Sequence, residues 1–115
     1  AITVEENDKA EICEAVQELV KTMMAKNGFT ADDIGAAIFS ATHDITAIFP
    51  AAAARRIDGW NFVPLFDAQQ MDVDNSIEKC IRVLLLVDVN KTQKEINHIY
   101  LRRAAMLRPD ISRKN

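Results

Sequence analysis

Apolar and polar positions follow a helical period near the start of the chain and strand-like runs farther along. Between Asn7 and Gly28, apolar side chains recur at helical spacing, at Ile12, Val16, Leu19, Val20 and Met23. This pattern predicts one long amphipathic helix of about 19 residues, capped by Asn7 and ended by Asn27-Gly28. The apolar stripe of this helix needs a sheet to cover.

Short apolar runs predict the strands of that sheet. Residues 34–41 and 80–87 are nearly continuous apolar runs, and residues 2–5 have the pattern of another strand. Residues 62–66 predict a further strand, which Pro64 places at an edge or a bulge because proline cannot donate a ladder hydrogen bond.

Capping signals place the remaining elements. Pro50, at a first helical position, predicts a short helix that Asp58-Gly59 ends. Thr92 and Glu95 form a capping box that opens one helical turn. Residues 96–107 then alternate loosely, which predicts a strand containing His98 and Tyr100.

This order of elements predicts an α+β fold, a mixed β-sheet with helices packed on one face. At 115 residues the chain is expected to form a single domain, residues 1–115. The other face of the sheet is then apolar, since the strand at 80–87 carries leucine and valine on both sides. A second copy of the chain would cover it.

Composition and charge narrow the function classes. The formal net charge is -3, which argues against a nucleic-acid partner because such proteins need a basic stripe. Basic side chains cluster only near the end of the chain and suit a small anion better, at Arg102, Arg103, Arg108, Arg113 and Lys114. No apolar run is long enough to span a membrane, and no signal-peptide pattern opens the chain.

Cysteine and histidine usage predicts neither a metal nor a cofactor. Cys13 and Cys80 are read as reduced, buried side chains of an intracellular, cytoplasmic protein, because they form no CxxC motif and have no nearby histidine. His43 and His98 have no acid or cysteine at catalytic or metal-ligand spacing. We assign the two histidines no chemistry.

Arg82 is the most informative residue, because a permanently charged guanidinium stands third in the apolar run at 80–87. An unpaired charge is costly to bury there. Two interpretations follow: Arg82 pairs with a carboxylate of the same fold, or it meets an anionic ligand.

A resemblance joins segments from the whole length of the chain. In order, they are residues 2–5, 40–42, 47–51, Arg55, Gly59-Trp60, Val63-Pro64, Gln69 with 71–73, 79–83, 98–101 and 107–110. Together they resemble the trimeric, pseudo-α/β-barrel class of chorismate mutases, the non-helical class of that enzyme. No single segment is specific, but all occur in the order of the family.

The resemblance implies an isomerase that converts chorismate to prephenate, the branch step toward phenylalanine and tyrosine. It also implies a homotrimer with active sites at subunit interfaces and no cofactor. The reaction is a pericyclic rearrangement that requires no acid, base or nucleophile. Catalysis is therefore expected from restraint of a flexible dianion in its compact conformer and from electrostatics at the breaking ether oxygen.

The resemblance also implies roles for individual residues. Arg82 would contact the ether oxygen and a substrate carboxylate, and Tyr100 would contact a carboxylate through its hydroxyl. Phe49 and Arg55 would come from the neighbouring subunit, as an apolar wall and a peripheral cation, although Arg55 is equally well read as a solvated helix residue. Leu107 and Arg108 would belong to a tail that closes over the ligand.

The chain departs from the family pattern in the candidate site. Gln70 stands where the family carries a glutamate, which accepts a hydrogen bond from the substrate ring hydroxyl. Gln70 still accepts that bond but without the charge, a loss of about 1–2 kcal/mol or on the order of tenfold in rate. Asp67 stands where the family often has a cysteine; it either supplies a replacement carboxylate to the same pocket or is a turn residue at the end of the strand.

A second departure lies at the start of the sequence. Family members have an Arg-Gly pair before the residue that matches Ala1, and the sequence given does not contain it. We expect the first strand to be truncated, and substrate binding to be weakened if Ala1 is the true start. Two alternatives remain: a degenerate trimeric module that binds a metabolite without turnover, and an enamine/imine hydrolase-like protein.

Overall fold

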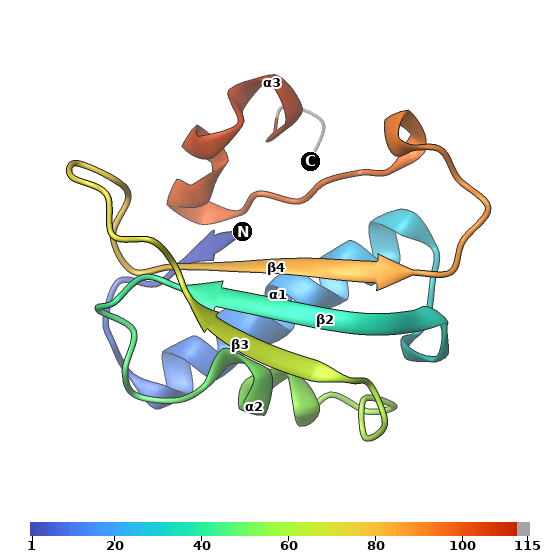
Figure 1. Cartoon of the computed structure of the whole chain (residues 1–115), viewed down its shortest axis with the longest axis horizontal. Coiled ribbons are helices and arrows are strands. Elements are labelled where there is room, and N and C mark those ends of the chain that lie inside the picture. The colour runs from blue at the N-terminus through green and yellow to red at the C-terminus, as the bar shows by residue number, and fades with distance from the viewer. Residues whose placement is uncertain (113–115) are drawn as a thin grey trace.

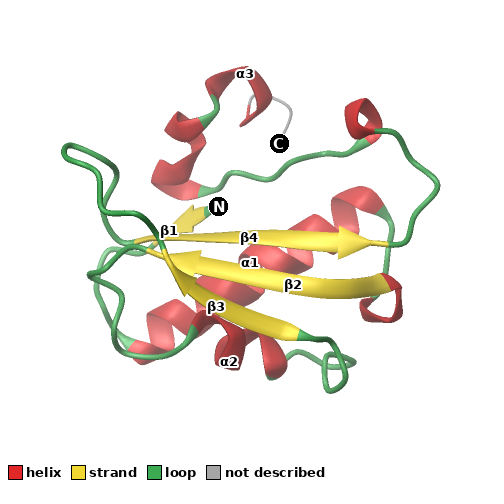
Figure 2. Cartoon of the chain, viewed as in Figure 1, coloured by secondary structure: helices red, strands yellow, loops and turns green. Residues whose placement is uncertain are grey.

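The computed structural model describes residues 1–112, which form a mixed four-stranded sheet with helices on one face (Figures 1 and 2). The strands are β1 (Ile2–Thr3), β2 (Ile34–Ala41), β3 (Leu65–Gln69) and β4 (Cys80–Val87), and their order in the sheet is β1-β4-β2-β3. Only β2 and β3 pair in parallel. Arg113 and Lys114, which the sequence analysis placed in a basic cluster, lie outside the described residues.

The helices are α1 (Lys9–Asn27), α2 (Pro50–Arg55) and the short α3 (Pro109–Ser112), with 3₁₀ turns at Ala31–Asp33, Gln93–Glu95 and Arg102–Leu107. Figure 1 shows α1 and α2 together behind the sheet. The apolar stripe of α1 is buried through Ile12, Val16 and Leu19, and it packs with Phe39 of β2 in one core. The predicted fold class is therefore confirmed.

The opposite face of the sheet is left open by residues 1–112. Along β4 the side chains alternate, so that Val83, Leu85 and Val87 pack against the core while Leu84 and Leu86 stay more than half exposed, at 58% and 53%. Arg82 shares their face. Its partner across the sheet is Ser40, and the partner of Leu84 is Ile38.

The long helix predicted between Asn7 and Gly28 is α1, which has 19 residues, but its N-cap is Asp8 instead of Asn7. The Asp8 carboxylate accepts the amide of Glu11 at 3.0 Å. Asn7 instead binds a distant turn, because its side-chain oxygen accepts the amide of Thr46 at 2.9 Å. Gly28 ends the helix in the left-handed region, with φ of 66°.

The strands at 34–41 and 80–87 are confirmed to the residue. The predicted strand at 62–66 is wrong in its bounds, since β3 begins only after Pro64, although it does lie at a sheet edge. The helix that begins at Pro50 ends at Arg55, before Asp58-Gly59.

The predicted strand containing His98 and Tyr100 is wrong. This segment is extended but pairs only with the first residue: the amino group of Ala1 donates to the carbonyl of Ile99 at 2.8 Å, and the amide of Leu101 donates to the carbonyl of Ala1 at 2.9 Å. Arg102 then takes a left-handed conformation, with φ of 56°, and begins a 3₁₀ turn. Two hydrogen bonds are too few to make a strand of the sheet.

Candidate active site

Arg82 lies on the open face of the sheet and has no carboxylate partner among residues 1–112. None of the ion pairs within residues 1–112 includes it. Burial raises the pKa of the neighbouring Cys80 thiol, and the positive charge of Arg82 opposes that rise. The sequence left two interpretations of Arg82 open. The described residues do not support the first, in which Arg82 pairs with a carboxylate of the same fold.

Tyr100 lies beside Arg82. Both line a cavity of about 280 Å³ with residues of β2, β4 and the chain start: Ala1, Ile38, Ser40, Val83 and Leu84. The two hydrogen bonds to Ala1 flank Tyr100 on either side and fix its backbone. A guanidinium and a phenol therefore face one cavity, a suitable pair for a carboxylate.

Phe49, Asp67 and Gln69 line a different cavity, of about 590 Å³, at the β3 edge of the sheet. Phe49 is the N-cap residue of α2 and is 72% exposed. Asp67 lies within β3, so the interpretation of Asp67 as a turn residue is wrong. Its carboxylate accepts the amide of Ala51 at 3.0 Å. Burial raises the pKa of Asp67, and that hydrogen bond and the charge of Arg55 oppose the rise.

Gln70 follows β3, and its amide donates to the carbonyl of Ala41 at 2.9 Å. Its side-chain oxygen Oε1 is buried and has no hydrogen-bond partner among the described residues. A buried acceptor without a partner is costly. Gln70 therefore offers a free acceptor, and it lines a third cavity, of about 210 Å³, with Thr42, His43 and Asp44.

Leu107 and Arg108 lie near the end of the described chain, outside these three cavities. The guanidinium of Arg108 forms two hydrogen bonds with Asp110, at 3.1 and 2.9 Å. These bonds raise the pKa of Arg108, with smaller contributions from the charge of Asp110 and from Tyr100. Such an exposed ion pair contributes little and is easily exchanged for another anion.

The described chain does not bring the predicted residues together: Gln70 lines the third cavity, Leu107 and Arg108 line none of the three, and the others form two separate groups. Arg82 and Tyr100 lie at the β4 side of the sheet, while Phe49, Asp67 and the nearby Arg55 lie at the β3 edge, with β2 between them. Sequence reasoning missed Ser40, which faces the Arg82 cavity, because its place depends on the register of β2 and β4. It also missed Asp44, although the run of polar residues 42–44 after the strand at 34–41 was a usable signal.

Comparison with known proteins identifies the class. The sequence model of the family described as chorismate mutase type I matches residues 1–111. The chain is 38% identical to Chorismate mutase AroH of Bacillus subtilis strain 168 over 112 residues, covering 97% of this chain and 88% of that protein. It is 43% identical to Chorismate mutase AroH of Thermus thermophilus, covering 96% and 91%.

A solved structure agrees with these matches. The chorismate mutase from Clostridium thermocellum superposes with a TM-score of 0.88 at 44% identity, covering 91% of this chain and 93% of that one. The chain belongs to the type I chorismate mutase family. It is an isomerase that converts chorismate to prephenate, and the two alternative functions are not favoured.

Two further observations bear on partners and metals. None of the helices in residues 1–112 combines the length and apolar character that a transmembrane span requires. Across the same residues, His, Cys, Asp and Glu side chains do not gather in groups of three that could hold a metal ion.

Gln70 and Asp67 give a first testable prediction. We expect Gln70→Glu to raise kcat on the order of tenfold if Gln70 has the role that the resemblance implies, because a carboxylate would bind the ring hydroxyl more strongly and oppose positive charge on the ring. Asn61→Asp makes the same amide-to-carboxylate change at an exposed residue in the loop before β3; it is the matched control and should leave kcat unchanged. Steady-state rates from the loss of chorismate absorbance measure both.

Asp67→Ala tests the compensation hypothesis separately. If Asp67 replaces the missing charge, its removal should lower kcat about tenfold. An unchanged rate would show that Asp67 does not replace the missing charge. Its role would then be limited to its contact with the start of α2.

Proposed function

We propose that chorismate rearranges at sites formed between the subunits of a homotrimer, with Arg82 at the breaking ether oxygen. The observation that carries this proposal is the guanidinium of Arg82, which has no ion-pair partner within residues 1–112 and is exposed beside Tyr100 on a mostly apolar sheet face. A charge without an internal partner is best explained by an anionic ligand.

The chemistry requires such a group. In the rearrangement a carbon–oxygen bond breaks while a carbon–carbon bond forms, and negative charge grows on the ether oxygen in the transition state. A fixed guanidinium interacts more strongly with that charge than with the neutral ether of the substrate, so it lowers the barrier instead of only tightening binding. The Tyr100 hydroxyl would hold a carboxylate and help to keep the substrate compact.

Gln70 would accept the hydrogen bond of the ring hydroxyl. Its buried, unpartnered Oε1 supports this role, since a substrate hydroxyl would satisfy it. In this chain the interaction is neutral, so the developing charge on the ring is opposed less strongly than by a glutamate.

The second group of residues supports an interfacial site. Phe49 and Arg55 are exposed at the β3 edge, far along the sheet from Arg82. A neighbouring subunit that packed its β3 edge against the Arg82 cavity would add an apolar wall and a second cation to that cavity. Leu107 and Arg108 would close the site, with Arg108 leaving Asp110 for a substrate carboxylate.

The open sheet face supports the trimer. Ile38, Leu84 and Leu86 lie on that face with Phe66 of β3, and all are exposed in a single copy. Exposed apolar side chains gathered on one face mark a protein interface.

We also propose that the enzyme acts in the cytoplasm, because Cys13 and Cys80 are free and buried, as in reducing compartments.

Subunit mixing tests this proposal. Arg82→Ala disables one half of each site, and the double variant Phe49→Ala/Arg55→Ala disables the other half. When the two chains are co-expressed with different tags and purified together, random assembly should give about one quarter of wild-type activity, because one site in four receives both intact halves.

Each variant alone should be far less active than the mixture. A mixture no more active than the average of the two variants would place the whole site within one subunit. Full activity of the double variant alone would remove Phe49 and Arg55 from the site.

A further inference from the structure

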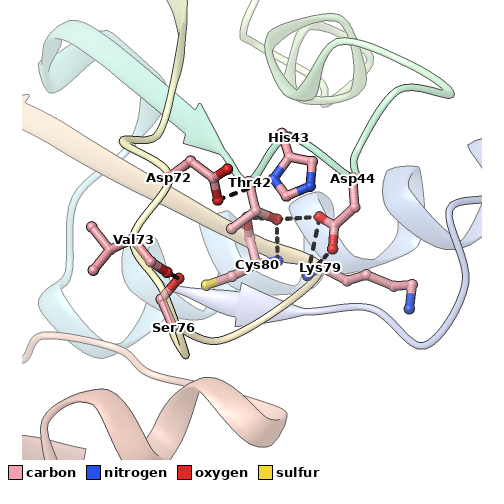
Figure 3. A network of polar contacts seen from close by, with 8 residues as sticks. All are labelled: Thr42, His43, Asp44, Asp72, Val73, Ser76, Lys79 and Cys80. Carbon is pink, nitrogen blue, oxygen red and sulfur yellow. Dashed lines mark hydrogen bonds and ion pairs between the residues drawn. The ribbon is translucent and has the colours of Figure 1, made fainter.

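A polar network holds the start of β4 against the end of β2, three residues before Arg82 (Figure 3). Its centre is Asp44, in the turn after β2. One carboxylate oxygen accepts the hydroxyl of Thr42, and the two oxygens accept the amide of Lys79 at 3.2 and 3.0 Å. Figure 3 shows the lysine side chain running away from Asp44, so the contact is with the backbone.

Thr42 links this carboxylate directly to β4. Its hydroxyl accepts the amide of Cys80 at 3.0 Å while donating to Asp44. Its own amide donates to the carbonyl of Cys80, also at 3.0 Å. Both polar groups of the Cys80 backbone are therefore bound by Thr42, and Cys80 lies two residues before Arg82 on the same face of the strand.

The backbone of Lys79 is strained, so its conformation has to be held by hydrogen bonds. Its φ is 46°, in the left-handed region that a residue with a side chain rarely adopts. Asp44 binds its amide, and the amide of Val4 donates to its carbonyl at 3.0 Å. These bonds hold the bend that turns the loop after β3 into β4.

The carboxylate is ionised at neutral pH. Burial pushes the pKa of Asp44 upward, but the hydrogen bonds from Thr42 and from the Lys79 amide outweigh it, and the pKa lies below its usual value. Charged acceptors form the stronger hydrogen bonds. The start of β4 is thus fixed by a charge-assisted contact instead of by packing alone.

We infer that Asp44 is a positioning residue for the isomerase reaction, acting through Thr42 and the bent backbone at Lys79 to set the place of the Arg82 guanidinium. The inference rests on the proposed catalytic role of Arg82. The same turn also fixes the other side of the site, because Ala41, just before Thr42, binds the amide of Gln70. Residues 41–44 therefore lie between the backbone segments that carry Arg82 and Gln70.

Asp44→Ala tests the inference. We expect kcat to fall about 10- to 100-fold with KM changed less than about threefold, because a displaced Arg82 loses contact mainly with the transition state. Asp44→Asn keeps an oxygen for the Lys79 amide and should recover kcat to within about threefold of wild type. Unchanged kcat in Asp44→Ala would overturn the inference.

Asp72→Asn is the matched control. Asp72 lies in the loop between β3 and β4 and pairs with His43, the neighbour of Asp44, at 3.4 Å, but both side chains are exposed. Its loss should leave kcat unchanged, since exposed pairs contribute little. A fall in kcat equal to that of Asp44→Ala would attribute the effect to any disturbance of the loops around Asp44 and overturn the inference.

A double-mutant comparison separates positioning from general destabilisation. In an Arg82→Ala background, Asp44→Ala should lower kcat by less than about twofold, because the group it positions is gone. An undiminished effect there would overturn the inference. If Arg82→Ala alone were fully active, the proposed function would fail instead, so the two failures are distinguishable.

Thr42→Val decides the question if Asp44→Ala does not fold. It keeps the shape of Thr42, removes the hydroxyl that joins Asp44 to Cys80, and should lower kcat about tenfold. A rate within about twofold of wild type in this variant would overturn the inference.

Discussion

Arg82→Ala should lower kcat/KM by about 10³-fold or more while leaving the fold intact. Loss of one preorganised donor at a developing negative charge costs on the order of 10²–10³ in rate, and a full positive charge is worth more than a neutral donor. Stability should hold because Arg82 forms no ion pair within residues 1–112 and is exposed on the sheet face. Chorismate consumption and thermal unfolding measure the two effects.

Arg82→Lys refines this result. Lysine keeps the charge but loses the planar fork that reaches two oxygens at once. We expect it to recover only part of the lost rate, between wild type and Arg82→Ala.

Arg103→Ala is the matched control. Arg103 is exposed, pairs with Glu5 at 3.6 Å and does not line the Arg82 cavity. Its loss should leave kcat/KM unchanged. Near-normal activity in Arg82→Ala, or a loss of similar size in Arg103→Ala, would contradict a specific role for Arg82.

Some elements of the fold were predictable because their signals are local. The strands at β2 and β4 are continuous apolar runs, and α1 combines a helical period with a glycine stop, so their bounds follow from sequence. The segment at residues 98–101 was predicted wrongly as a strand. Its loose alternation reflects contacts with Ala1 at the other end of the chain, and the left-handed turn at Arg102 leaves no mark in the sequence.

The candidate site, like the fold, was predictable only in part from the sequence. The sequence identified Arg82 by its charge within an apolar strand, and the resemblance added Tyr100 and Phe49. Neither source indicated that Arg82 shares a cavity with Ser40 or that Asp44 binds the backbone before β4. Both facts depend on strand register and on pairing between residues more than 30 positions apart, which a single sequence does not encode visibly.

Leu86→Glu should convert the proposed trimer to monomers and abolish most of the activity. Leu86 is 53% exposed in the single chain and lies on the open sheet face four residues after Arg82, outside the cavity that Arg82 lines. Burial of an unpaired carboxylate there costs several kcal/mol, enough to prevent association. Light scattering after size exclusion should report a single chain with the circular dichroism of wild type.

Activity should fall with assembly, by about 10²-fold or more, because each Arg82 cavity then lacks the residues of its neighbour. Phe62→Glu provides the control: Phe62 is 97% exposed but lies in the loop before β3, so the same charge should change neither mass nor rate. In Leu86→Glu the loss of assembly and the loss of activity must occur together. A fully active monomer would disprove the interfacial site. A trimer of unchanged stability would show that a second copy does not cover the open face, because a buried, unpaired glutamate on that face is incompatible with tight packing.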